Sequence, residues 1–294
     1  MSLGLQRSRR VNLWLHRHLL IGGDISTESD RAFGASVAEI YESHLVPLIF
    51  EPYAVELARR MNGFRLSRVL ELAAGTGVLT RALANTLPPS VAITATDLNP
   101  DMLERAITTG ISRPVEWRQA DALRLPFGDA THDAVVCQFG VMFFPDKRAA
   151  FAEARRVLRP GGQLLFSVWD RIEENEFADT VTAAVAAVFP DDPPSFLRRT
   201  PHGYFDGPTI ARDLFLGGFT GAVDMQTFPA RSRAEWPGAV AVAYCQGTPL
   251  RHEIESRDGR GLAAATAVAT TAIVRRFGPG PVDGKMQAHI VSVS

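Results

Sequence analysis

The chain has 294 residues, of which 46% are hydrophobic and 21% are charged, and its formal net charge is −1. These values exclude a predominantly disordered protein and describe a chain long enough to bury a full core. A net charge this close to zero provides no general attraction to nucleic acid or to an anionic membrane. Cys137 and Cys245 are too few for a disulfide framework or a cysteine-rich metal site, so we expect a cytoplasmic protein.

The first 30 residues differ from the rest of the chain. Arg7, Arg9 and Arg10 precede a short apolar stretch, an arrangement that faintly resembles a twin-arginine export signal. Basic residues interrupt the stretch at 16–18, so we expect residues 1–30 to be an N-terminal extension that is disordered rather than exported. No apolar run approaches the roughly 18 to 20 residues of a membrane-spanning helix, so no membrane span is expected.

Helical spacing begins after this extension. Apolar residues recur every three to four positions from Phe33 to Met61, and Pro52 restarts the pattern. We expect two short helices here, lying over the ligand-binding edge of a sheet. Phe33 and Tyr41 lie on this segment and could contact the ligand, but packing in the core is the favoured role for both.

From Arg68 to Trp169 the sequence alternates between strand and helix patterns. Helices start clearly at Pro100 and Asp146, and the predicted strands are 68–72, 91–97, 115–120, 134–138 and 163–169. This alternation predicts an α/β fold, a doubly wound Rossmann-like sheet with helices on both faces. Ligands of such sheets bind beyond the carboxyl ends of the parallel strands.

The composition changes after Trp169. The pattern predicts helices at 177–188 and 209–216, strands at 222–228 and 286–293, and a mostly helical segment at 234–277 that is interrupted at 247–249. We therefore expect residues 31–170 to form the N-terminal helices and the cofactor-binding core. Residues 171–294 would supply a helical cap and the final strands of the same domain.

The turn after the first strand indicates the kind of ligand. Gly75 and Gly77 lie between a buried strand and a helix, where the backbone can approach a ligand and the helix directs its N–H groups at it. A dinucleotide-binding fingerprint requires a further glycine where this chain has Thr80. Glu71 suits hydroxyl or ammonium groups better than phosphate. The turn therefore favours a ligand with a ribose and an amino-acid tail.

Acidic residues follow three successive predicted strands, at Glu71, Asp97 and Asp121. A carboxylate after the second strand can accept hydrogen bonds from both hydroxyls of a ribose, each worth roughly 1.5 to 3 kcal/mol. Asp121 can accept from the amino group of an adenine. Ala122 and Leu123 would lie beside the adenine ring, and Leu98 and Met102 would cover its faces.

Five ordered stretches resemble the class I S-adenosylmethionine-dependent methyltransferases, in the branch of the ubiquinone and menaquinone biosynthesis methyltransferases (methyltransferase type 11). They are Val69–Gly77, Thr96–Met102, Ala120–Phe127, Asp133–Asp146 and Val157–Gly162. Ala73 stands where many relatives have a glycine. The resemblance implies a seven-stranded sheet with an antiparallel last strand and S-adenosylmethionine as cofactor. It also implies that Ala73, Gln138 and Phe139 line the cofactor site, the last two near the methyl group.

Methyl transfer from a sulfonium requires alignment, exclusion of water and, for some acceptors, removal of a proton. An aromatic face at Phe139 would favour the cationic sulfur. His202 and His252 are the candidates for a general base, and Tyr204 lies near His202 in the sequence. We expect His132 to lie in a surface turn and expect no metal site.

The sequence leaves several alternatives open. The apolar, alanine-rich segment after Trp169 favours a small aromatic, quinone-like or lipid-like acceptor, and no basic stripe indicates nucleic acid as a partner. A methyltransferase acting on RNA or protein, a NAD(P)-dependent oxidoreductase and a non-catalytic S-adenosylmethionine-binding protein are the alternative readings. The methylated atom and the oligomeric state cannot be read from the sequence, and a homodimer stays open.

Overall fold

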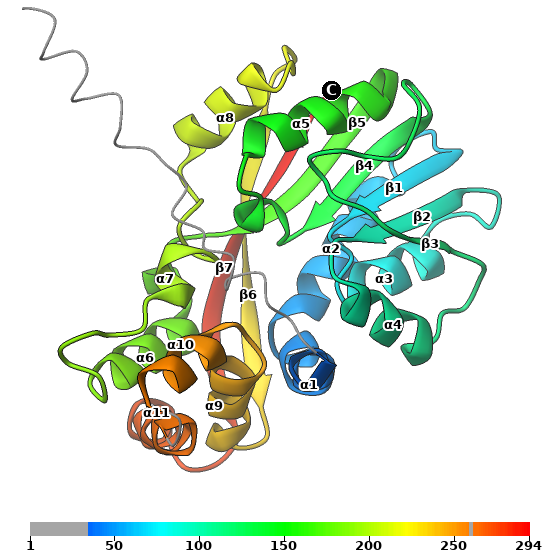
Figure 1. Ribbon diagram of the computed structural model, residues 1–294. Helices are drawn as coiled ribbons and strands as arrows, with labels where there is room; N and C mark the ends of the chain where they lie inside the picture. The colour runs from blue at the N-terminus through cyan, green and yellow to red at the C-terminus, as the bar shows by residue number, and fades with distance from the viewer. Residues whose placement is uncertain (1–34, 259–260) are drawn as a thin grey trace, which may run out of the picture.

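The computed structural model describes residues 35–258 and 261–294. The expected N-terminal extension, residues 1–30, and Phe33 lie outside the described residues. One mixed sheet of seven strands, in the order β3-β2-β1-β4-β5-β7-β6, forms the centre of the molecule. Helices α2 to α4 cover one face of the sheet, and α5 and α8 cover the other (Figure 1). The predicted doubly wound α/β fold is confirmed.

The first five strands are parallel, as the alternating pattern predicts. They are β1 (Arg68–Leu72), β2 (Ala92–Asp97), β3 (Glu116–Gln119), β4 (His132–Gln138) and β5 (Leu158–Trp169). The connecting helices are α3 (Val78–Thr86), α4 (Pro100–Thr109) and α5 (Lys147–Val157). Asn99 caps α4 by accepting from the N–H groups of Asp101 and Met102, and Asp146 caps α5 at Ala149. The Asn99 cap places the start of α4 directly after β2, whereas a short 3₁₀ turn separates β4 from the capped start of α5.

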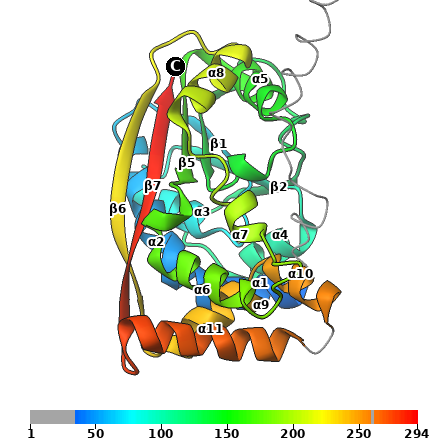
Figure 2. The same cartoon turned by 90° about the vertical axis from the view of Figure 1, so that its left-hand side faces the viewer.

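The last strand, β7 (Val282–Val293), lies antiparallel between β5 and β6 (Asp224–Ala234), as expected. Strand β6 is longer than the predicted 222–228, because Pro229 does not end it. Proline is tolerated on an edge strand, and β6 is the last strand of the sheet. The β6–β7 ribbon extends past the other strands toward the cap (Figure 2).

The N-terminal helical region is continuous rather than broken at Pro52. Helix α1 (Ala35–Ile40) leads into the π-helical segment η2 (Tyr41–Phe50) and then into α2 (Glu51–Met61). Pro52 occupies the first turn of α2, where its missing N–H is tolerated, and Pro47 lies inside the wider π turns. π-Helical turns are rare and often occur at functional sites.

The remaining helices gather at one end of the molecule and form the cap (Figures 1 and 2). They are α6 (Glu176–Ala186), α7 (Phe196–Arg199), α9 (Pro237–Gln246), α10 (Leu250–Arg257) and α11 (Gly261–Phe277), whereas α8 (Gly207–Leu216) packs beside α5. Short 3₁₀ turns, η3 (Val141–Phe143) and η4 (Ile172–Glu174), follow β4 and β5. Within the described ranges, no helix is long and apolar enough to cross a membrane.

Candidate active site

A cavity of about 460 Å³ lies beyond the carboxyl ends of β1, β2 and β4. Its walls come from the turns after β1, β2, β3 and β4 and from Tyr41 of η2. Most of the predicted cofactor residues line it: Ala73, Gly75, Asp97, Leu98, Met102, Asp121, Ala122, Gln138 and Phe139. The structure therefore brings together side chains that are far apart in the sequence.

Glu71 and Gly77 belong to the same turn but do not line the cavity. Glu71 is 1% exposed, and burial raises the pKa of its carboxyl group to about 8. A Cβ on Gly77 would lie 3.1 Å from Trp117 and 3.2 Å from Ala106, and its φ is +84°. Gly77 is thus required for the turn and for close packing on α4 and β3. Direct contacts of these two residues with a cofactor stay predictions.

Asp97 organises the turn from the end of β2. Its Oδ2 accepts from the N–H of Gly75 at 2.8 Å, and its Oδ1 accepts from the N–H of Asn99 at 2.8 Å. Burial raises the pKa of Asp97 above its ordinary value, while the hydrogen bonds from these backbone groups oppose that shift. The carboxylate connects the glycine turn to the start of α4, and it faces the cavity with its remaining acceptor capacity.

Arg156 on α5 holds the loop that carries Asp121, and the sequence analysis did not identify it. Its guanidinium donates to the carbonyl oxygen of Phe127 at 2.7 Å and to that of Leu125 at 3.0 Å. It also pairs with Asp129 and Glu153. An arginine at the end of a helix carries no sequence signal for this role, because its partners are backbone carbonyl groups.

Gln138 lines the cavity and carries a buried acceptor that has no partner in the described part of the chain. Its Nε2 donates to the carbonyl oxygen of Phe50 at 2.8 Å, and its Oε1 is buried without a hydrogen-bond partner among the described residues. A buried acceptor without a partner is costly, so it marks a position where a ligand donor or a water completes the site. This residue connects the end of β4 to the π-helical segment.

A second cavity, of about 70 Å³, adjoins the first and shares Tyr41, Phe139 and Phe143 with it. Phe139 stacks on Trp169 with ring centroids 3.9 Å apart and an angle of 4° between the planes. The other aromatic rings of its wall are Phe50, Phe196 and Tyr244. They come from η2, α7 and α9, so no local motif indicated them.

The two histidine candidates for a general base differ in their position relative to the cavities. His202 lines the small cavity, whereas His252 lies on α10 and lines neither cavity. Tyr204 is buried, and its hydroxyl donates to Asp213 at 3.2 Å. The prediction that His132 lies in a surface turn is wrong. It is the first residue of β4 and is 5% exposed, because the strand begins two residues before the apolar run.

The part of the chain that forms the large cavity matches a known protein family. Residues 70–166 match the family model of a methyltransferase domain. This segment is a methyltransferase domain. It contains most of β1, all of β2 to β4, most of β5 and every wall residue of the large cavity except Tyr41.

The methyltransferase domain is similar to ubiquinone/menaquinone biosynthesis C-methyltransferases. The protein of Pseudomonas savastanoi pv. phaseolicola is 39% identical over 121 residues, which are 40% of this chain and 46% of that protein. The protein of Saccharophagus degradans is 34% identical over 154 residues, which are 48% of this chain and 61% of that protein. The chain thus spans less than two thirds of either relative.

Solved structures share the fold of the methyltransferase domain. The YcgJ protein of Bacillus subtilis matches with a TM-score of 0.51 at 18% identity, covering 82% of this chain and 97% of that chain. A phosphoethanolamine N-methyltransferase of Haemonchus contortus, solved with phosphomonomethylethanolamine and S-adenosylhomocysteine, matches with a TM-score of 0.55 at 16% identity. That match covers 90% of this chain and 59% of that chain. At these identities the likeness concerns the fold.

Proposed function

We propose that the chain is an S-adenosylmethionine-dependent methyltransferase that acts on a small, apolar acceptor. The observation that carries this proposal is the pair of adjoining cavities at the carboxyl ends of the strands of a methyltransferase domain. The large cavity suits the cofactor, and the small aromatic cavity suits the acceptor. Phe139, which lines both, would lie where the methyl group passes from one to the other.

The charges of the large cavity favour this cofactor over a dinucleotide. Asp97, Asp101 and Asp121 line it, and no Lys or Arg does among the residues that the structure describes. Carboxylates without a basic partner repel a pyrophosphate but attract a sulfonium or an ammonium group. The same feature opposes the alternative of a NAD(P)-dependent oxidoreductase.

Several of the predicted cofactor residues would contact the cofactor directly in this arrangement. Asp97 would accept hydrogen bonds from the ribose hydroxyls, and Asp121 would accept one from the adenine amino group. Leu98 and Met102 would cover the adenine ring, while Gln138 Oε1 would take a donor from the cofactor or acceptor. When bound, S-adenosylmethionine supplies an activated methyl group on a sulfonium, and the chain aligns it and excludes water.

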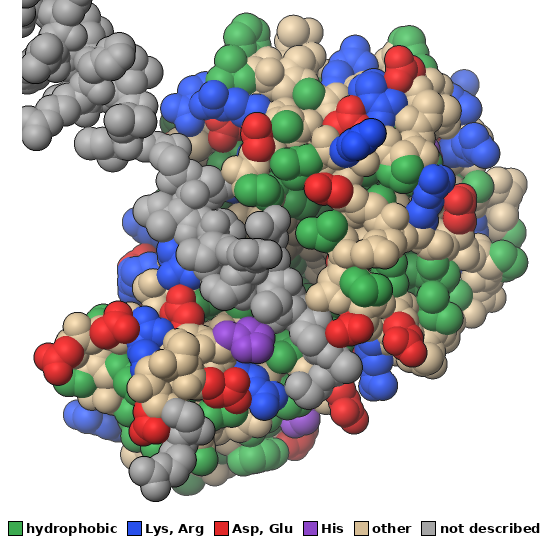
Figure 3. Space-filling model, viewed as in Figure 1, with side chains coloured by type: hydrophobic (Ala, Val, Ile, Leu, Met, Phe, Trp, Pro, Cys, Tyr) green, Lys and Arg blue, Asp and Glu red, His purple; other side chains and the backbone are tan. Residues whose placement is uncertain are grey.

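The small size of this cavity favours a small molecule over RNA or protein. Phe196 of α7, Tyr244 of α9 and the adjoining Thr248 line it on the side of the cap. On the face drawn in Figure 3, basic and acidic side chains are interspersed rather than gathered in a basic stripe. We extend the proposal to a cytoplasmic location and to a single domain formed by the core, residues 31–170, and the cap, residues 171–294.

Calorimetric titration with S-adenosylmethionine, S-adenosylhomocysteine and NADH tests the proposal. We expect micromolar binding of both sulfur nucleotides and none of NADH. Asp97→Ala removes the expected partner of two ribose hydroxyls, so its affinity for S-adenosylhomocysteine should fall about a hundredfold or more. Binding of NADH alone would indicate an oxidoreductase and contradict the proposal.

A further inference from the structure

The wall of the small cavity determines which acceptors it can hold. It is lined mainly by apolar and aromatic side chains, and no Asp, Glu, Lys or Arg contributes to it within residues 35–258 and 261–294. A charged acceptor would lose its hydration there without gaining a partner, at a cost of several kcal/mol. The cavity therefore selects a neutral, aromatic or otherwise apolar group.

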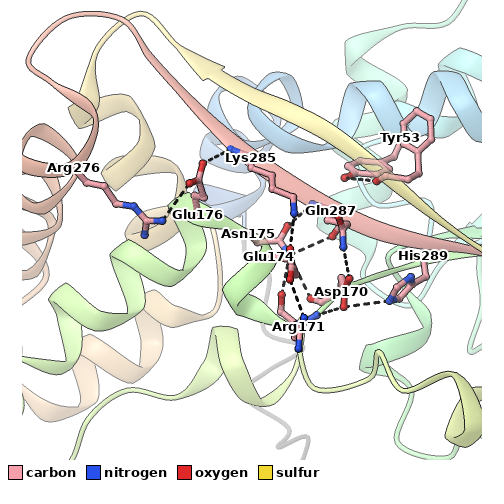
Figure 4. Close-up of polar contacts among 11 residues, drawn as sticks. Tyr53, Asp170, Arg171, Glu174, Asn175, Glu176, Arg276, Lys285, Gln287 and His289 are labelled. Atoms are coloured by element: carbon pink, nitrogen blue, oxygen red, sulfur yellow. Dashed lines mark hydrogen bonds and ion pairs between the residues drawn. The ribbon is translucent and has the colours of Figure 1, made fainter.

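Two polar side chains of this wall already form hydrogen bonds with backbone groups. Asn175 Nδ2 donates to the carbonyl oxygens of Arg171 and Gln287, both at 3.2 Å, and its Oδ1 accepts from the N–H of Gln287 at 3.0 Å (Figure 4). The Thr248 hydroxyl donates to the carbonyl oxygen of Tyr244 at 2.7 Å. Burial raises the pKa of Tyr244, so that phenol stays protonated. None of these groups is suited to take a proton from an acceptor.

His202 is the wall residue with a basic nitrogen. Its Nδ1 lies 2.8 Å from the carbonyl oxygen of Asp170. A carbonyl oxygen can only accept, so Nδ1 carries the hydrogen and Nε2 of the neutral ring bears a lone pair. No hydrogen bond to Nε2 occurs among the described residues. His202 is 6% exposed as a residue, and the centroid of its ring lies 5.9 Å from that of Trp169, which stacks on Phe139.

Asp170, which fixes the orientation of His202, is itself held firmly. Its carboxylate accepts from Gln287 Nε2 at 2.6 Å and from the N–H of Arg171 at 2.7 Å, and it pairs with His289 at 3.2 Å (Figure 4). Its N–H donates to the carbonyl oxygen of Gln287 at 3.1 Å. The carbonyl group that sets the tautomer of His202 is therefore fixed between the end of β5 and β7.

The geometry points to an acceptor that carries a hydroxyl group on an aromatic ring, with His202 Nε2 as the group that accepts the hydroxyl hydrogen. This inference rests on the proposed function and adds the acceptor class and the base. His202 lies outside residues 70–166, so the match to the methyltransferase family model does not include it.

The hydroxyl oxygen forms a bond to the methyl carbon while the bond from that carbon to the sulfonium breaks, and the electron pair of the broken bond stays on sulfur. The hydroxyl proton moves to His202 Nε2, giving an imidazolium, an aryl methyl ether and S-adenosylhomocysteine. An oxygen that is gaining a third bond becomes strongly acidic, so even a weak base suffices to take the proton.

The protonation state of His202 agrees with this role. Burial lowers the pKa of its imidazole to about 4, so the ring is neutral near pH 7 and its lone pair is available. The charged groups that act on it are Asp170 and Glu173, which oppose the shift, and Arg198, which adds to it. His202 is 6% exposed, which limits the access of water to Nε2.

Nitrogen-15 NMR of histidine-labelled protein tests the geometry without turnover. With S-adenosylhomocysteine bound at pH 7, Nδ1 of His202 should give the signal of a protonated nitrogen and Nε2 that of an unprotonated one. Phenol should shift the Nε2 signal, whereas anisole, which lacks the hydroxyl hydrogen, should not. A hydrogen on Nε2, an unshifted signal at saturating phenol or an equal shift with anisole would overturn the inference.

A matched pair of variants tests the chemistry. His202→Asn keeps a donor for the Asp170 carbonyl oxygen and removes Nε2, so methylation of phenol to anisole should fall about a hundredfold or more. His252→Asn changes a histidine outside both cavities and should leave the rate unchanged. Equal rates in the two variants, or a ring-methylated product, would contradict the assignment.

Binding of S-adenosylhomocysteine separates this inference from the proposed function. Both variants should bind it as the original chain does, because neither residue lines the large cavity. If the original chain binds S-adenosylhomocysteine but fails the phenol tests, the acceptor assignment alone is wrong. If the original chain does not bind it, the proposed function fails.

Discussion

The two cavities are built in different ways. The walls of the large cavity come mostly from turns that directly follow β1, β2, β3 and β4, and backbone groups fix their shape, as in the contact of the Gly75 N–H with Asp97. The walls of the small cavity come from η2, the end of β5, α7 and α9, and packed side chains fix its shape. A cavity made by backbone turns leaves a local sequence pattern, whereas one made by distant side chains does not.

The largest expected effect follows from the backbone character of the large cavity. A Cβ on Gly140 would lie 2.5 Å from the Cβ of Ala73 and 2.7 Å from Sγ of Cys137. The neighbours are a methyl group and a buried thiol that both lie next to the backbone and cannot move aside, so Gly140→Ala should lower the free energy of unfolding by about 3 kcal/mol. Urea unfolding measures this change.

Gly128→Ala is the matched control. Its new Cβ would meet Thr131 at 3.6 Å, an ordinary contact, so the free energy of unfolding should change by less than about 0.5 kcal/mol. Equal stability of the two alanine variants would show that the close approach of Ala73 and Gly140 is not what shapes the large cavity.

The pH dependence of the free energy of unfolding is an effect of intermediate size. It tests whether two histidines are buried as neutral rings. Burial lowers the pKa of both His202 and His132 to about 4, below the ordinary value of 6.5. The unfolded chain binds more protons between these values, so the free energy of unfolding should fall as the pH is lowered from 6.5 toward 4. His202→Asn should make this slope shallower by up to about 1.4 kcal/mol per pH unit.

His132 serves as the comparison for this measurement, because it lies at the start of β4, away from the carboxyl-end cavities. Arg68 and Arg159 add to the lowering of its pKa, while Asp133 and Glu116 oppose it. His132→Asn should reduce the slope in the same direction without changing methyl transfer. An unchanged slope in either variant would mean that the histidine concerned is not buried as a neutral ring.

The smallest expected effect concerns the support of the loop that carries Asp121. Arg156→Ala removes the donors to the carbonyl oxygens of Leu125 and Phe127, so the loop should loosen. We expect the affinity for S-adenosylhomocysteine to fall about tenfold, measured by calorimetry. Arg155→Ala, a change at the neighbouring position of α5, should leave the affinity unchanged, and equal losses would contradict the role of Arg156.

The difference between the two cavities explains which features of the structure can be predicted from the sequence. The parallel strands, the caps at Asn99 and Asp146 and most residues of the large cavity follow from local patterns, because each depends on a few adjacent residues. The extent of β6 and the burial of His132 do not, because they depend on pairing with distant strands.

The residues of the small cavity are also not predictable from local sequence patterns. Trp169 and Phe196 line it through contacts between segments far apart in the chain, and only the fold brings them together. His202 and His252 are alike in the sequence, and their positions relative to the cavities distinguish them. The acceptor site is therefore inferred from packing rather than from a motif.

A crystal structure of the complex with S-adenosylhomocysteine would show directly whether the large cavity holds the cofactor. We expect the ribose hydroxyls within hydrogen-bond distance of Asp97, the adenine beside Asp121, and the sulfur facing Phe139 and the small cavity. S-adenosylhomocysteine bound with its sulfur directed away from the small cavity, or bound outside the large cavity, would contradict the account.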